Sequence, residues 1–148
     1  MLVSRYKLWL VCGALLGGAA VAFGAFGAHG LRDEFLKDAA SPGELTAAEF
    51  RLLENWETAA RYAMYHGLAL LAVGLVAARR CGVAINLAGT SMTLGTLIFS
   101  GCLFALVLTG ESWLGRVVPI GGLLMIVGWV CLLVAVWNDR PLENKAAR

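Results

Sequence analysis

A chain of 148 residues that is 59% apolar and only 15% charged, with a mean hydropathy of +0.75, does not have the composition of a soluble domain. Soluble globular chains carry about 45–50% apolar and about 25% charged residues, so this chain falls outside that class. The length is that of one domain, and the net charge of +2 gives no indication of nucleic-acid binding.

The apolar residues are concentrated in four blocks that contain no charged side chain. In chain order these blocks are Leu8–Ala28, Tyr62–Ala78, Gly82–Gly110 and Val117–Trp137. A helix needs about 20 mostly apolar residues to cross the hydrocarbon, where lipid offers no partner to backbone N–H and C=O groups. The blocks lack the alternation of barrel strands. We therefore predict an all-α polytopic membrane protein, a single membrane domain over 1–148, with transmembrane helices at about 8–28, 59–78, 83–109 and 117–137.

The first block is predicted to remain as the first transmembrane helix. Arg5 and Lys7 before an apolar run, with small residues near its end, also fit a secretory signal. The run is long for a signal peptide core, however, and three further apolar blocks follow it.

The loop over 30–57 is the one sizeable connection, and it is predicted to be helical and amphipathic. Leu31, Phe35 and Leu36 stand among charged residues, which suits a short interfacial helix. The turn signal Ser41–Gly43 follows, and Thr46 with Glu49 has the spacing of a capping box. The helix that starts there either continues into the second span or bends at the interface. The sequence favours neither.

Lysine and arginine are distributed unequally between the two sides of the membrane. Seven of the twelve flank the termini and the second loop: Arg5, Lys7, Arg79, Arg80, Arg140, Lys145 and Arg148. The other five belong to the first and third loops and the entrance of the second span: Arg32, Lys37, Arg51, Arg61 and Arg116. Because cytoplasmic loops are enriched in these residues, both termini are expected in the cytoplasm of a bacterial inner (plasma) membrane protein.

Small residues recur at helical spacing on several spans, which is typical of close helix packing in a bilayer. The predicted packing positions are Gly13, Gly17, Gly24, Gly27, Gly67, Gly95, Gly101, Gly121, Gly122 and the mid-span Trp129. An alternative interpretation is that these small residues also form the contact face of a homodimer. Pro119 is expected in the first turn of the fourth helix, where it costs no hydrogen bond. Trp9, Trp56, Trp113 and Trp137 are expected in interfacial belts.

Ionisable and polar residues near the loop side of the membrane are the candidate site. The proposed polar cluster consists of His29, Glu57, Arg61, Tyr62 and His66. Glu57 and Arg61 are four residues apart and can pair along a helix. One interpretation of the cluster is structural, with buried polar groups that bond across helices. Proton-coupled or small-molecule binding is a second interpretation, because histidine titrates near neutral pH.

Haem ligation by His29 and His66 is a third interpretation. Two histidines are too few for a zinc site. Cys12, Cys102 and Cys131 lie inside apolar runs and form no CxxC pair. We therefore expect no metal site, no cofactor and no catalytic residue.

Four ordered motifs resemble a known membrane protein family. They are GAFGAHGL at 24–31, WETAARYAMYHGLALL at 56–71, FSGCLFAL at 99–106 and PIGGLLMIVGW at 119–129. Together they resemble domain of unknown function 423, whose relatives include animal transmembrane protein 256. The family often has serine, tyrosine and threonine where this chain has Cys102, Phe104 and Val118. The resemblance implies a four-helix inner-membrane protein and no specific activity.

The leading functional interpretation is a structural or interaction protein, alone as a homo-oligomer or within a larger membrane complex. A small transporter or channel component that uses His29, Arg61 and His66 is the alternative. A haem- or quinone-contacting protein is third. Apart from the lipid bilayer, the expected partners are other membrane proteins.

Overall fold

The computed structural model describes residues 3–38, 45–79 and 82–137, and these residues are almost entirely helical. The elements are α1 (Val3–Phe26), the π-helix η1 (Gly27–Leu31), α2 (Arg32–Asp38), α3 (Ala47–Arg79), α4 (Val83–Thr109) and α5 (Leu114–Trp137). Four helices are long and apolar enough to cross a membrane, the first being the continuous stretch Tyr6–Lys37. The prediction of an all-α protein with four transmembrane helices is confirmed.

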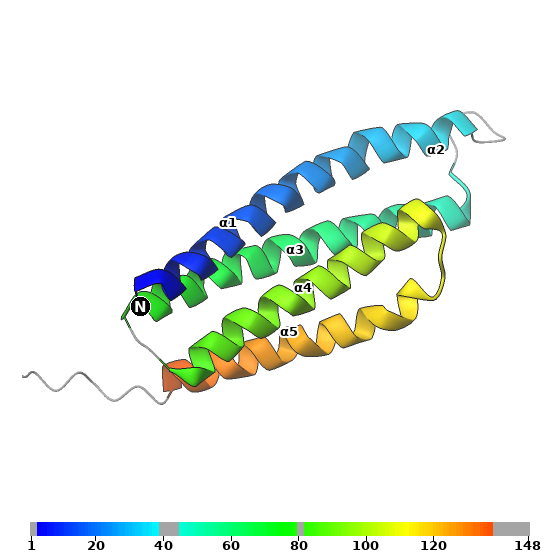
Figure 1. Ribbon diagram of the computed structural model, residues 1–148. Coiled ribbons are helices and arrows are strands. Elements are labelled where there is room, and N and C mark those ends of the chain that lie inside the picture. Colours follow the sequence, from blue (N-terminus) through cyan, green and yellow to red (C-terminus); the bar gives the residue numbers. More distant parts are fainter. Residues whose placement is uncertain (1–2, 39–44, 80–81, 138–148) are drawn as a thin grey trace, which may run out of the picture.

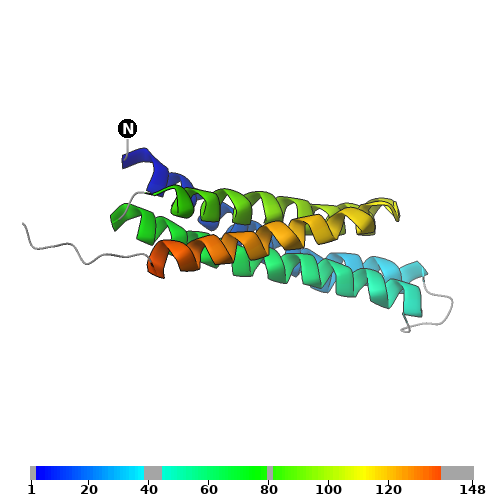
Figure 2. The same cartoon turned by 90° about the horizontal axis from the view of Figure 1, so that it is seen from below.

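The helices lie side by side in chain order (Figure 1). α1 packs along α3, α3 packs on α4, and α4 packs on α5, whereas α3 and α5 approach each other only slightly. Seen from below, α1 passes behind the other three long helices (Figure 2). The beginning of α1 and the end of α5 lie at the same end of the bundle, and α2 lies at the opposite end, here called the loop end (Figure 1).

The loop helix and the second span form one continuous helix, α3, so the structure decides between the two alternatives. Its start is the predicted capping box. The Glu49 N–H donates to Thr46 Oγ1 at 3.3 Å, and the Glu49 carboxylate accepts from the Thr46 N–H and hydroxyl at 2.7 Å each. The predicted turn at 41–43 lies outside the described residues.

The first span does not stop at residue 28 but continues through η1 into α2, so that the expected interfacial helix extends α1. The π-helix starts close to a contact between α1 and α3. The indole N–H of Trp56 donates to the Phe23 carbonyl of α1 at 2.7 Å, and the π-helix starts four residues later at Gly27.

The fourth helix begins earlier than predicted. α4 ends at Thr109 and is capped by Gly110, whose φ of 72° is left-handed. Backbone hydrogen bonds over Glu111–Arg116 follow, and α5 starts at Leu114. Pro119 is therefore the sixth residue of α5 and not part of its first turn. Because proline has no N–H, it leaves one carbonyl of the preceding turn without its helical partner.

Two apolar clusters form the interior. Near the termini, Trp9 packs with Leu70, Val73 and Met92, among others. At the loop end, Trp56 packs with Leu31 and Val107. Trp9 and Trp56 were predicted to lie in interfacial belts. They are only 6% and 2% exposed, so both are part of the interior instead. Their indoles cover glycines, Gly89 for Trp9 and Gly27 for Trp56, which removes both rings from the lipid-facing surface.

Glycines allow two close helix–helix contacts. A Cβ on Gly13 would lie 2.7 Å from the Gly67 carbonyl oxygen, and a Cβ on Gly95 would lie 2.8 Å from the Gly121 carbonyl oxygen. Gly17 and Gly24 lie along the same α1–α3 contact, and Gly122 lies 3.9 Å from Phe99 by the same measure. Gly101 differs from the prediction, because it is exposed on α4 and a Cβ there would meet nothing within 4 Å.

Candidate functional site

Among the residues that the structure describes, His66, Thr96 and Ser100 are buried polar side chains. Thr96 bonds back to the Met92 carbonyl of its own helix at 2.7 Å. Ser100 donates from α4 to the Ala59 carbonyl of α3 at 2.8 Å. A polar group buried without a partner is costly, and these hydroxyls each have one.

His66 connects α3 to α5. Its Nδ1 lies 2.9 Å from the Tyr62 carbonyl oxygen, and the Trp129 indole N–H donates to its Nε2 at 3.3 Å. A carbonyl only accepts and an indole N–H only donates. The arrangement therefore specifies a neutral imidazole with its proton on Nδ1 and its lone pair turned to Trp129. Ligation of a metal by Nε2 would require Trp129 to move away.

Three hydrogen bonds between helices thus converge on α3. Trp56 donates to α1, Ser100 of α4 donates to Ala59, and Trp129 of α5 donates to His66. Each bond joins α3 to a different helix. Because a bilayer supplies no hydrophobic drive between helices, such bonds and close packing determine which helices associate.

The loop end contains a cavity of ≈ 590 Å³. One side is formed by η1 and α2, and the other by the first turns of α3 and the segment before it. Its charged lining residues are Arg32, Glu54, Glu57 and Arg61. Its apolar lining residues include Leu36, Leu45, Phe50 and Leu53.

The structure divides the five residues of the proposed polar cluster between two places. Glu57 and Arg61 line the loop-end cavity, and His29 lies exposed on η1, next to Gly27 and Ala28 of the same cavity. Tyr62 and His66 turn toward α4 and α5, where the Tyr62 ring lies 4.7 Å from that of Phe99.

Glu57 and Arg61 have the spacing that allows an ion pair along the helix, but they do not form one. Arg61 donates instead to the Thr58 hydroxyl at 3.3 Å, and within the described residues the ion pair found joins Lys37 to Glu34. Because both side chains are exposed, pairing would bring little free energy against the entropy of holding two long chains.

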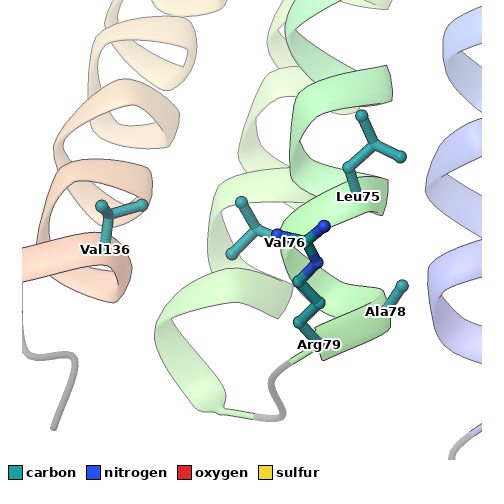
Figure 3. A pocket seen from close by; sticks show the side chains of 5 residues that line it. All are labelled: Leu75, Val76, Ala78, Arg79 and Val136. Carbon is teal, nitrogen blue, oxygen red and sulfur yellow. The ribbon is translucent and has the colours of Figure 1, made fainter. Parts of the chain in front are cut away.

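A second cavity of ≈ 340 Å³ lies at the opposite end of the bundle (Figure 3). Leu75, Val76, Ala78 and Arg79 of α3 face Val136 of α5 there. Arg79 supplies its one charged group, and its guanidinium bends back along α3 toward Val76 (Figure 3).

Sequence reasoning missed the roles of Trp56 and Ser100. Both stand in the motifs that carry the family resemblance, but a tryptophan beside a charged loop is typical of an interfacial belt. The usable signal was the chemistry of the side chains. A buried indole or hydroxyl usually bonds to a carbonyl, as Trp56 and Ser100 do across helices, whereas the buried Trp9 indole N–H has no partner among the described residues.

Comparison with known proteins addresses the resemblance. The family model described as "Protein of unknown function (DUF423)" matches residues 23–122. The chain belongs to the DUF423 family. The match covers η1, α2, α3, α4 and the start of α5, so it includes the loop-end cavity and two of the three α3 hydrogen bonds.

Curated relatives of this DUF423 chain are named as membrane proteins. It is similar to a UPF0382 membrane protein of Staphylococcus aureus (strain bovine RF122 / ET3-1), with 41% identity over 132 residues, covering 89% of this chain and 97% of the relative. A Staphylococcus epidermidis (strain ATCC 12228 / FDA PCI 1200) relative is 41% identical over 129 residues, covering 87% and 94%. One from Staphylococcus haemolyticus (strain JCSC1435) is 39% identical over 132 residues, covering 89% and 97%. No solved structure matches the DUF423 chain.

Proposed function

We propose that this DUF423 chain is a structural or interaction subunit of the bacterial inner (plasma) membrane, which assembles with itself or with a larger membrane complex. The observation that carries this proposal is that three buried side chains take part in hydrogen bonds between α3 and another helix. His66, Ser100 and Trp56 all bond to other helices of the same chain. These polar side chains, which could otherwise take part in catalysis or ligand binding, therefore hold the helices of the bundle together.

The proposed contact surface is the loop end, formed by α2 and the first two turns of α3. Exposed acids on this surface include Asp33, Glu34 and Glu54, and Phe50, four residues before Glu54 on α3, is 61% exposed. A large apolar side chain among charges outside the hydrocarbon is typical of a site where another protein packs.

The proposed orientation places both termini in the cytoplasm and the loop end outside. The beginning of α1 and the end of α5 lie at the same end of the bundle, which supports two termini on one side (Figure 1). Seven of the twelve Lys and Arg residues belong to the termini and the second loop, and cytoplasmic segments carry such an excess.

The test is purification of the tagged full chain in a mild detergent after brief cross-linking in cells. We expect a second copy or one defined membrane partner to co-purify, and Phe50→Glu to abolish the association. Ser112→Glu is the matched control, because Ser112 is also exposed and lies in the turn between α4 and α5.

Retention of the partner by Phe50→Glu would contradict the proposed contact surface. The transporter alternative makes a different prediction, namely solute uptake by proteoliposomes of the purified chain that His66→Ala abolishes. Such uptake in the absence of a co-purifying partner would replace the structural proposal.

A further inference from the structure

The loop-end cavity has the size of a small-molecule site. Its volume of ≈ 590 Å³ falls within the range of about 300–1,000 Å³ that such sites occupy. Gly27 and Ala28 of the π-helix form part of its wall, and π-turns inside long helices are found frequently at functional sites. The cavity therefore has room for a ligand. None of the buried polar side chains described above lines it.

Two arginines line the cavity from different elements. Arg32 comes from the start of α2 and Arg61 from the middle of α3. In the part of the chain that the structure describes, neither lies within ion-pair distance of a carboxylate. Because a guanidinium presents a planar fork of N–H donors, two arginines that line one cavity are suited to a phosphate group.

Two carboxylates line the same cavity. Glu57 lies three residues after Glu54 on α3, and Arg61 lies four residues after Glu57. Carboxylates accept hydrogen bonds from an ammonium group and repel a second phosphate. The combination of charges favours a ligand that carries one phosphate and one ammonium.

The cavity lies where the bilayer surface is expected. Gly27 and Ala28 are the last residues of the first charge-free run, and Arg61 directly precedes the second such run. Leu36, Leu45 and Phe50 add an apolar part to the lining. These three residues lie further from the charge-free runs than Arg61, on the outer side of the cavity. A ligand held at Arg32 and Arg61 therefore has its charged group in the headgroup layer, where the charge-free run of the first span ends and that of the second begins.

We propose that the loop-end cavity binds the headgroup of a phospholipid with a primary ammonium, from the leaflet that faces the loop end. Arg32 and Arg61 hold its phosphate, and Glu54 and Glu57 accept from its ammonium. The cavity lies within one chain, so this binding does not require the assembly proposed above.

Native mass spectrometry of the purified full chain tests the assignment with defined lipids. The probes are phosphatidylethanolamine, phosphatidylcholine, whose quaternary ammonium has no N–H, and phosphatidylglycerol, which has no ammonium. We expect phosphatidylethanolamine to be retained most strongly. Arg61→Gln should lower its binding at least about tenfold, since hydrogen bonds to charged groups are worth that factor or more.

The matched control is Arg116→Gln. Arg116 is exposed at the loop end of α5 but does not line the cavity. We expect Arg116→Gln to bind like the unmodified chain, and Glu57→Gln to lose the preference for phosphatidylethanolamine over phosphatidylglycerol. Circular dichroism of each variant establishes that the helices are intact, and Arg61→Lys provides a second variant that keeps the charge without the fork.

Three results would overturn the assignment. The first is equal retention of the three lipids. The second is an equal loss of binding in Arg116→Gln and Arg61→Gln, which would indicate general charge attraction. The third is binding of free phosphoethanolamine or inorganic phosphate as strongly as the lipid, which would identify a site for a soluble phosphate.

Discussion

At the residue scale, hydrogen-bond chemistry assigns His66 a structural position. The Tyr62 carbonyl and the Trp129 indole leave one arrangement of protons, with Nδ1 as donor and Nε2 as acceptor. Trp129 is 49% exposed, so this bond lies at the edge of the bundle and joins two helices that otherwise hardly touch.

Trp129→Phe should therefore weaken the bundle. The variant keeps an aromatic ring but removes the donor, and we expect the free energy of unfolding to fall by about 0.5–1.5 kcal/mol. Trp113→Phe is the control, since Trp113 is 50% exposed and donates no hydrogen bond in the described structure. Denaturation in mixed detergent micelles measures both. An equal effect of the two variants would show that ring size and not the bond to His66 matters.

Glu49 provides a pH-dependent contact at the start of α3. Hydrogen bonds from the backbone and side chain of Thr46 lower the pKa of the Glu49 carboxyl below its ordinary value of 4.5. A lowered pKa in the folded chain means that this stabilisation is present above about pH 4.5 and is lost as the pH falls through the folded value.

Thr46→Ala should raise the Glu49 pKa toward its ordinary value, because both donors to the carboxylate are weakened or lost. Carboxyl chemical shifts followed by NMR across pH 2–7 measure this on isotopically labelled protein. Thr58→Ala is the control, since the Thr58 hydroxyl bonds to Arg61 and not to a carboxylate. An unchanged Glu49 titration in Thr46→Ala would show that the capping box does not form in the membrane.

At the element scale, backbone proximity distinguishes two glycines of α4. Gly95 lies against the Gly121 backbone of α5, whereas Gly101 lies six residues further along and faces open space. Helices that approach this closely have no room for an added carbon, since interiors are packed without free volume.

Gly95→Ala should destabilise the α4–α5 pair, at a cost of about 1–3 kcal/mol for overpacking. Gly101→Ala should be neutral or stabilising by up to about 1 kcal/mol, because alanine is the better helix former. Thermal unfolding of both variants in the same detergent makes the comparison. Equal tolerance of the two substitutions would mean that α4 and α5 are further apart than the structure shows.

At the scale of the whole molecule, the beginning of α1 and the end of α5 lie at the same end of the bundle, and the proposed orientation puts that end in the cytoplasm (Figure 1). Reporter fusions that are active only in the cytoplasm should therefore be active at both ends, and a reporter inserted between Asp38 and Leu45 should be silent. Moving lysines from the cytoplasmic segments to the loop end tests the cause of this orientation, because the distribution of Lys and Arg between the two sides sets it. Activity at one terminus only would contradict an even number of spans.

Much of the architecture follows from the sequence alone. Charge-free runs of sufficient length determine that this chain crosses a membrane four times, because hydrocarbon leaves the backbone no other way to satisfy its polar groups. The capping box at Thr46 was also predictable, since it depends on two residues three positions apart. In the same way, the small residues on α1 and α3 indicate close packing through local spacing.

Only the tertiary structure decided which side chains meet across helices. The indole of Trp56 bonds to α1, His66 turns to Trp129, and Glu57 and Arg61 turn to a cavity with Arg32. These contacts depend on the rotation of each helix about its axis and on the identity of its neighbour. Spacing along one helix specifies neither, because residues far apart in the sequence have no fixed distance until the helices pack.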